Sequence, residues 1–304
     1  CNKPLKDLST NKFLIAYSGG LDSSVLLDCF YELSVNSSIQ IRSIHVNHGL
    51  SDKSDLHQGH CELISKKYGI DHISEKIQIK SKSNIEENCR NERYKKISKY
   101  CKEDELIVTA HHEEDQVETF FLRLIRGSGV RGLSCMKSLT ISNGKKLFRP
   151  FLHVSKKEIM DYQANNDIKY IEDETNYENI YDRNYIRNEV LPSLKSRWPS
   201  LNKNILNNIL VQNIQSNFTK DNIELMLPVF YGADENELSI SKLNQEELHT
   251  IIIILHEWVY LRTKIMLNLK QIKEIIKILN TSNDSNPLFK FSTIEIKKRR
   301  DILS

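Results

Sequence analysis

The sequence predicts an α/β protein, with a doubly wound parallel sheet followed by a smaller, mainly helical C-terminal domain. The run Phe13–Tyr17 is apolar and too short for a buried helix, as expected of an interior strand of a parallel sheet. Runs of this kind alternate with stretches of helical period up to residue 125. Around residues 198–208 the composition turns Asn-rich, and Pro192 and Pro199 bracket a predicted domain boundary. We therefore expect domains at residues 1–198 and 199–304.

The first domain is expected to begin with four strands, each followed by a helix. After the strand Phe13–Tyr17, apolar residues recur at helical spacing between Val25 and Leu33. The same reasoning predicts further strands at 39–46, 72–79 and 105–110, and helices at 54–68, 86–101, from 113 onward and 155–165. Ser155 and Glu158 have the spacing of a capping box at the start of the last of these helices.

Composition narrows the class of protein. The chain has 304 residues, of which 27% are charged and 39% hydrophobic, as in ordinary globular proteins. No apolar run approaches the ~18 residues of a membrane span, and the N-terminus lacks a signal peptide, so we expect a cytoplasmic protein without a membrane partner. The six cysteines are scattered without a C-x-x-C pair, which favours reduced thiols over a disulfide framework, a zinc site or an iron–sulfur cluster.

The turn after the first strand, Ser18-Gly19-Gly20-Leu21-Asp22-Ser23, is typical of a phosphate-binding loop. The two glycines allow a tight turn, and the amides at the start of the next helix favour an anion. The loop lacks the lysine of the common G-x-x-x-x-G-K-[ST] loop. Asp22 stands there instead, and a carboxylate beside a polyphosphate implies Mg²⁺ between them. A purely structural Gly-Gly turn is the alternative.

The string S-G-G-x-D-S after a first strand resembles the PP-loop of the ATP pyrophosphatases, a family that cleaves ATP between the α- and β-phosphates. The resemblance implies a Rossmann-like sheet and a bound ATP. It also implies that ATP is bound by Ser18, Gly19, Gly20, Leu21, Asp22 and Ser23, and that Asp22 holds Mg²⁺.

Two histidines follow predicted strands. His48 comes shortly after the second strand and His111 directly after the fourth, and the carboxyl edge of an open parallel sheet is where ligands bind. We therefore expect His48 and His111 on the ATP side of the sheet. His45 and His48 as metal ligands form the weaker alternative, because no third ligand lies near them in the sequence.

Charged side chains of the helix that begins near residue 113 are the next candidates. Asp115 and Glu118 are three residues apart and share one face, close to the strand end. Acidic residues in the first turn interact favourably with the helix dipole and stabilise a helix by ~0.3 to 1 kcal/mol each. Helix stabilisation alone is therefore the alternative to a role in the site. Arg123 and Arg126 close the helix and suit phosphate as well as the helix C-terminus.

Together, four strings resemble those of the tRNA(Ile)-lysidine synthetase family: SGGLDS, HVNHGL, TAHHEEDQVETFFLRLIRGSGVRGLSCM and RPF. The resemblance spans most of residues 13–192. It departs at Glu114, where the family usually has an aspartate. It implies catalytic roles for Asp22, Asp115, Glu118, Arg123 and Arg126.

A further stretch, 171–192, carries an acidic string followed by R-N-x-I-R. Arg183 and Arg187 are four residues apart on one helical face, which is either a solvated basic face or part of a site. The resemblance implies that Arg183, Asn184 and Arg187 line the nucleotide or tRNA side. We expect Pro192 to end the helical run.

Charge is segregated in the second domain. Residues 221–261 hold eight acidic side chains and one lysine, whereas residues 262–304 hold ten basic and four acidic side chains. Lys270, Lys273 and Lys277 lie opposite an apolar helical stripe, and residues 297–300 add a basic cluster. A basic segment of this kind indicates a polyanionic partner, or else a solvated face with a ragged tail.

The resemblance implies a two-step reaction on tRNA(Ile) with a CAU anticodon. ATP adenylates O2 of the wobble cytidine and releases pyrophosphate, and the ε-amine of free lysine then displaces AMP to give lysidine. Asp115 and Glu118 suit an ammonium substrate. The rival predictions are another PP-loop enzyme, such as a tRNA thiolase or an amidotransferase-type synthetase, and a non-catalytic nucleotide- or RNA-binding module. The sequence leaves a homodimer open.

Overall fold

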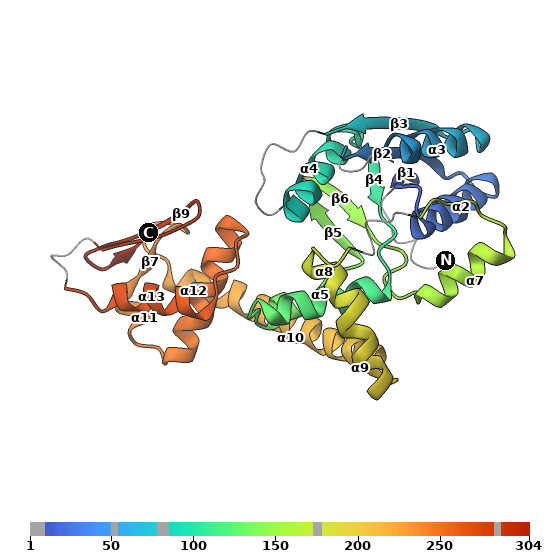
Figure 1. Cartoon of the computed structure of the whole chain (residues 1–304). Helices are drawn as coiled ribbons and strands as arrows, with labels where there is room; N and C mark the ends of the chain where they lie inside the picture. Colours follow the sequence, from blue (N-terminus) through green and yellow to red (C-terminus); the bar gives the residue numbers. More distant parts are fainter. Residues whose placement is uncertain (1–9, 50–53, 78–84, 173–177, 283–286) are drawn as a thin grey trace. The chain divides into compact units, whose positions relative to one another are not determined.

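The computed structural model describes residues 10–49, 54–77, 85–172, 178–282 and 287–304 (Figure 1). The chain packs into two compact units. Residues 1–122 and 135–207 form the first, and residues 123–134 and 208–304 form the second. The chain therefore enters the second unit twice. The assignment of residues 1–198 to catalysis and 199–304 to tRNA binding stays a prediction.

The first unit is built on a six-stranded sheet with the strand order β3-β2-β1-β4-β6-β5. Five of the strands are parallel, and β5 runs antiparallel to β6 at one edge. The strands are β1 (Lys12–Ala16), β2 (Gln40–Asn47), β3 (Asp71–Lys76), β4 (Glu105–Val108), β5 (Leu139–Ser142) and β6 (Lys145–Phe148). The strands β5 and β6 were not predicted from the sequence. Asn143 and Gly144 between them both have positive φ, and Asn-Gly is a strong hairpin signal.

Helices cover both faces of this sheet, as a doubly wound fold requires (Figure 1). They are α2 (Leu21–Val35), α3 (Ser54–Lys67), α4 (Ile85–Tyr100) and α7 (Lys156–Asn165). A further helix, α5 (Glu113–Ile125), follows β4. Side chains of β1 alternate between the two faces. Phe13 and Ile15 share a buried cluster with α2, α3 and α7, whereas Leu14 packs with Ile97 of α4. The predicted doubly wound parallel sheet is thus confirmed.

A continuous helical run follows in α8 (Asp182–Tyr185), the π-helical turn η2 (Ile186–Val190) and α9 (Leu191–Arg197). The expectation that Pro192 ends the run is wrong. Pro192 stands in the first turn of α9, directly after η2. A wider π turn before a proline accommodates its ring and its missing N–H, so the helical path continues.

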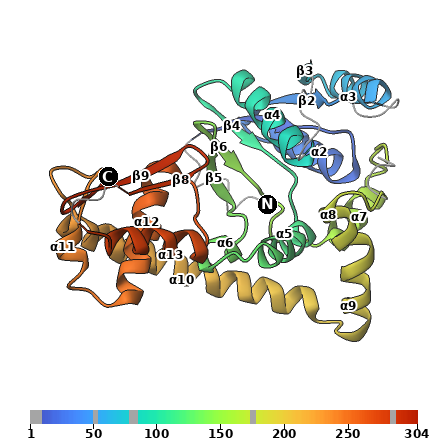
Figure 2. The same ribbon diagram turned by 60° about the vertical axis from the view of Figure 1, so that its left-hand side comes forward.

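Among the described residues, the second unit contains the end of α5, part of α10 (Leu201–Phe230), four further helices and a four-stranded antiparallel sheet. The helices α12 (Leu248–Thr263) and α13 (Leu269–Leu279) pack with β8 (Leu288–Phe291) and β9 (Ile294–Arg299) (Figure 2). The remaining elements are α6 (Val130–Leu133), α11 (Ile240–Leu243), β7 (Leu238–Ser239) and β10 (Ile302–Leu303). The predicted helical C-terminal region is confirmed, but its small sheet was not foreseen.

Lys298 of this sheet is not part of an exposed basic cluster, as the sequence of residues 297–300 had suggested. Residues 297–300 belong to β9 and the turn after it, so they do not form a ragged tail. Alternation along the strand buries Lys298, whose Nζ donates to Leu279 O at 2.9 Å and to Thr281 O at 2.6 Å. Lys298 thus satisfies the carbonyls at the end of α13 instead of facing solvent. Among the helices that the structure describes, none has the length and apolar character of a membrane span.

Candidate active site

The glycine loop joins β1 to α2 at the carboxyl edge of the sheet. Gly19 has φ of +82°, and a Cβ there would lie 3.1 Å from Cys61 Sγ, so both backbone conformation and space require glycine. Ser18 N–H donates to Ser23 Oγ at 3.2 Å, and Ser23 Oγ donates to Gly20 O at 3.0 Å. Gly20 is the N-cap of α2 and has no side chain to accept from the first-turn amides. The serines therefore shape the loop, and the helix start favours an anion.

Asp22 lies in the first turn of α2 and carries two cationic neighbours. Lys156 Nζ donates to Asp22 Oδ1 at 2.5 Å, and His112 Nε2 lies 3.5 Å from Asp22 Oδ2. Burial alone would raise the pKa of the Asp22 carboxyl, but His112 and Lys156 outweigh it and lower that pKa. Asp22 is therefore an ionised carboxylate, and its side chain is 31% exposed.

His112 connects the glycine loop to α5. Its Nδ1 lies 3.1 Å from Glu114 Oε2, and its Nε2 lies 3.6 Å from Asp115 Oδ2 on the side that also faces Asp22. Burial opposes the charged imidazole, yet these carboxylates raise the pKa of His112 to about 10. His112 is therefore an imidazolium near neutral pH. His112 was not among the site residues predicted from the sequence, although a histidine just before three acidic residues is a usable signal.

Asp115 and Glu118 share one face of α5, as predicted, and both are paired with arginines. Arg183 Nη2 donates to Asp115 Oδ1 at 2.7 Å, and Arg183 Nε donates to Glu118 Oε2 at 2.7 Å. Arg187 Nε donates to Glu118 Oε1 at 2.6 Å. Desolvation would raise the pKa of Asp115, but His112 and Arg183 lower it far below its ordinary range. The structure thus brings four predicted site residues into one ion-pair network.

Three further predicted residues have defined positions in the first unit. His111 follows β4, its Nδ1 lies 2.9 Å from Thr109 Oγ1, and burial holds the pKa of His111 well below its ordinary value. His48 follows β2 at the same carboxyl edge. Asn184 donates to Glu178 O at 2.9 Å and so supports its own turn. The acidic string's residues 173–177 lie outside the described residues.

Arginines also influence the charge of His111. Burial is the main cause of the lowered pKa of His111, and Arg90, Arg149 and Arg183 lower it further, whereas Asp115 raises it. Of these three arginines, only Arg183 was predicted as a site residue. Arg90 and Arg93 of α4 lie over the Tyr94 ring, with guanidinium carbons 5.2 and 5.7 Å from its centroid.

Arg123 and Arg126 belong to the second unit. Arg123 Nη1 donates to Gly132 O at 2.5 Å and closes the loop after α5. Arg126 is exposed and borders a cavity of about 740 Å³ between that loop, α10, α12 and α13. Catalytic roles for Arg123 and Arg126 stay predictions.

The residues present fit ATP with Mg²⁺. The donor set at the loop is one ionised, partly exposed carboxylate, Asp22, beside a helix start that favours phosphate. Mg²⁺ is commonly held by one or two carboxylates together with substrate phosphates and water. Among the described residues no group of three or more His, Cys, Asp or Glu forms a metal cage, so Asp22 would share the ion with phosphate oxygens.

Comparison with known proteins places this site in a family. A PP-loop domain model matches residues 1–194. Over 311 residues the chain is 33% identical to the tRNA(Ile)-lysidine synthase of Haemophilus influenzae (strain 86-028NP), which covers 99% of this chain and 71% of that protein. The chain belongs to the tRNA(Ile)-lysidine synthase family.

Other matches agree with this membership. The tRNA(Ile)-lysidine synthase of Buchnera aphidicola subsp. Schizaphis graminum (strain Sg) is 37% identical over 297 residues, covering 96% of this chain and 66% of that protein. The chain thus spans about two thirds of the length of these family members. Among solved structures, the U34-tRNA thiolase NcsA from Methanococcus maripaludis matches with a TM-score of 0.52 and 19% identity over 67% of this chain and 73% of that one, which shows the fold alone.

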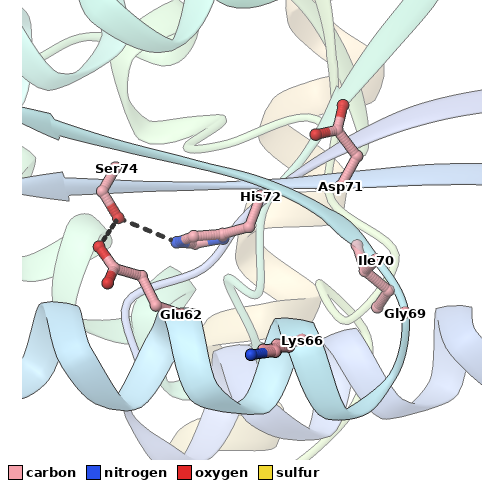
Figure 3. A pocket seen from close by; sticks show the side chains of 7 residues that line it. All are labelled: Glu62, Lys66, Gly69, Ile70, Asp71, His72 and Ser74. Atoms are coloured by element: carbon pink, nitrogen blue, oxygen red, sulfur yellow. Dashed lines mark hydrogen bonds between the residues drawn. The ribbon is translucent and has the colours of Figure 1, made fainter.

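A second polar network lies between α3 and β3, beside a groove of about 580 Å³ (Figure 3). Ser74 Oγ donates to Glu62 Oε1 at 2.8 Å, so it accepts from His72 Nε2 at 3.1 Å. With its proton on Nε2, a neutral His72 has Nδ1 as an acceptor, 2.8 Å from Ser43 Oγ and 3.2 Å from Ser65 Oγ. These two serine hydroxyls lie 3.0 Å apart, and either one can donate to the other. The bond to Ser74 therefore favours the Nε2-protonated tautomer of a neutral His72.

Proposed function

We propose that the protein forms lysidine in tRNA(Ile) with a CAU anticodon, using ATP, Mg²⁺ and free lysine. The observation that carries the proposal is the bridge that His112 makes between Asp22 on the glycine loop and Asp115 on α5. It supports one site with a nucleotide side and an ammonium side. Membership of the lysidine synthase family supports the same reaction.

The first step is proposed to be adenylation of the cytidine. O2 of the wobble base attacks the α-phosphate, and pyrophosphate leaves. The Gly19–Gly20 backbone and the start of α2 would bind the phosphates, and Asp22 would hold Mg²⁺, which neutralises charge as the α–β bond breaks. A single-stranded anticodon base reaches such a pocket more easily than a paired base does.

In the second step the ε-amine of lysine attacks C2 of the base, and AMP leaves. The ammonium of lysine has three donors and suits the carboxylates of Asp115 and Glu118. Arg187 is the partner that we expect lysine to displace, because its side chain is 37% exposed whereas that of Arg183 is 17% exposed. The lowered pKa of Asp115 favours binding of the ammonium over a role as general base.

The tRNA is proposed to dock on exposed basic side chains of the second unit. Lys270, Lys273 and Lys277 are exposed along α13, while Ile272 and Ile275 of the same helix are buried, which confirms the predicted stripe. Lys297 and the turn after β9 add further positive charge. Such contacts bind phosphates without reading sequence. The same proposal places the protein in the cytoplasm, and a homodimer stays a prediction for sedimentation measurements.

Mass spectrometry of tRNA nucleosides tests the reaction. Purified protein is incubated with CAU-bearing tRNA(Ile), ATP, Mg²⁺ and lysine, and we expect a mass gain equal to lysine minus water on one cytidine. Methionine tRNA with the same anticodon is the matched control for specificity. With α-labelled ATP and no added lysine, label on the tRNA would demonstrate the adenylated intermediate. Pyrophosphate release without modified tRNA would contradict the proposal.

A further inference from the structure

The ion pair between Lys156 and Asp22 joins residues 134 positions apart in the chain. Lys156 is the first residue of α7, and its backbone N–H donates to Glu114 Oε2 at 3.0 Å. Ser155 and Glu158 close a capping box around the same turn. Ile159, one turn further on, is buried in the cluster that also holds Val25 of α2. The backbone at Lys156 is therefore fixed beside the glycine loop.

The side chain of Lys156 is less constrained than its backbone. It is 35% exposed, and its Nζ ends on a carboxylate that is itself 31% exposed. An ion pair of this exposure contributes little to stability, because water screens the charges and two flexible side chains must be ordered. Lys156 can therefore leave Asp22 when a better anion arrives.

The loop itself offers no cation for a polyphosphate. Phosphate loops of the common kind place a lysine on the β- and γ-phosphates, and residues 18–23 contain none. Asp22 stands in the first turn of α2, and the Lys156 ammonium is bonded to it. An anion bound at the start of α2 would therefore lie close to this ammonium. A compact ammonium with three donors is a good ligand for clustered phosphate oxygens.

We propose that Lys156 binds the β- and γ-phosphates of ATP and then the leaving pyrophosphate. The inference rests on the proposed function for the identity of the nucleotide reaction. When ATP binds, the Lys156 ammonium leaves Asp22 and bonds to phosphate oxygens instead. The Asp22 carboxylate would then be available to Mg²⁺. The lysine that the common loop carries within its own sequence is here supplied by α7, a separate helix.

A role limited to balancing the charge of Asp22 predicts a different behaviour. In that case, removal of the ammonium leaves pyrophosphate affinity unchanged or raises it, because the ammonium makes no bond to phosphate and Asp22 becomes free for Mg²⁺. Direct phosphate binding predicts weaker binding of every ligand with a β-phosphate and no change for AMP. Ligand affinity therefore separates the two roles without reference to turnover.

The experiment is calorimetric titration of the full chain with pyrophosphate, ATP and AMP in the presence of Mg²⁺. For Lys156→Ala we expect ~10- to 100-fold weaker binding of pyrophosphate and ATP, as for removal of one charge-assisted hydrogen bond. AMP affinity should stay within about twofold, which also shows that the variant is folded. Lys156→Arg should recover most of the affinity. Lys157→Ala is the matched control, since Lys157 is the next residue and is exposed.

Two outcomes overturn the inference: native pyrophosphate affinity in Lys156→Ala, and an equal loss of AMP and pyrophosphate affinity. Lysidine formation by the native protein is measured in parallel. If the native protein makes lysidine while Lys156→Ala binds pyrophosphate normally, the inference alone is refuted. If the native protein makes no lysidine but Lys156→Ala binds pyrophosphate weakly, the proposed function is refuted and the inference is supported.

Discussion

Arg183 and Glu118 lie 65 residues apart in the chain, and the Arg183 Nε donates to Glu118 Oε2 at 2.7 Å. The Glu118 side chain is 2% exposed, so this bond holds a buried carboxylate in place. Arg187 occupies its other oxygen. Removing a guanidinium from a buried carboxylate is costly unless another cation takes its place, because the buried negative charge would be left without a partner. Lysine binding at this position therefore means exchange of one cation for another.

Replacing Asp115 with Asn or Glu118 with Gln should separate the two half-reactions. Adenylation should survive, and the lysine step should show a raised KM, because losing one charge-assisted hydrogen bond forfeits ~1.5 to 3 kcal/mol. Rapid-quench measurement follows the adenylated tRNA and its decay with added lysine. Glu113→Gln removes a charge from the same helical turn and is the control. Collapse of adenylation itself would assign the carboxylates to the nucleotide.

Asp22→Ala should abolish pyrophosphate release while tRNA affinity stays near native. The carboxylate is the proposed Mg²⁺ ligand, whereas tRNA is expected to dock on basic side chains of the second unit. Release is measured with labelled ATP, and tRNA affinity by filter binding. Native release rates in Asp22→Ala would refute the metal role.

Exposed basic residues at the end of β9 should bind tRNA phosphates. Joint replacement of Lys297, Arg299 and Arg300 with Ala should weaken binding and flatten its salt dependence, by ~0.7 to 0.9 in slope for each phosphate that is no longer neutralised. Lys298→Ala is the matched control, because Lys298 is buried and donates to Leu279 O and Thr281 O. It should lower the melting temperature and leave the salt slope unchanged. An unchanged slope in the triple variant would make these residues a solvated face.

His112 should make the fold more sensitive to alkaline pH. Its pKa rises from the ordinary 6.5 to about 10 in the folded protein. The stabilisation is therefore fully present below pH 6.5 and is lost as pH rises through about 10. Denaturant unfolding between pH 6 and 10.5 should show this loss in native protein and less of it in His112→Gln. An imidazole NMR signal titrating near pH 6.5 would contradict the expectation.

His72 should make the folded protein less stable at acidic pH, whereas His112 does so at alkaline pH. Burial lowers the pKa of His72 from 6.5 to about 4, and nearby Glu62 and Asp71 do not offset it. Stability should therefore fall as pH drops from 6.5 toward 4, because the unfolded chain takes up the proton first. His72→Asn should weaken this dependence. In the neutral ring, Nδ1 accepts from the hydroxyl of Ser43 or Ser65, and protonation of Nδ1 would remove this acceptor. Figure 3 shows the His72 ring beside Ser74.

Local patterns explain what the sequence determined. The glycine loop, the alternation of strands and helices, the Ser155–Glu158 capping box and the shared face of Asp115 and Glu118 were all predictable. Each depends on the backbone conformation or the helical and strand periods of a few neighbouring residues. A missed feature of the same kind is the β5–β6 hairpin, whose Asn143-Gly144 turn was visible in the sequence.

Only the tertiary structure decided which charges meet. Lys156 reaches Asp22 because α7 packs on the same face of the sheet as α2, and Arg183 reaches Glu118 because a later helix returns to α5. No local period relates residues 134 or 65 positions apart. Lys298 illustrates the same point, since a basic run in the sequence does not show which of its members a strand will bury. Burial and ion pairing follow from packing, and packing is a property of the whole fold.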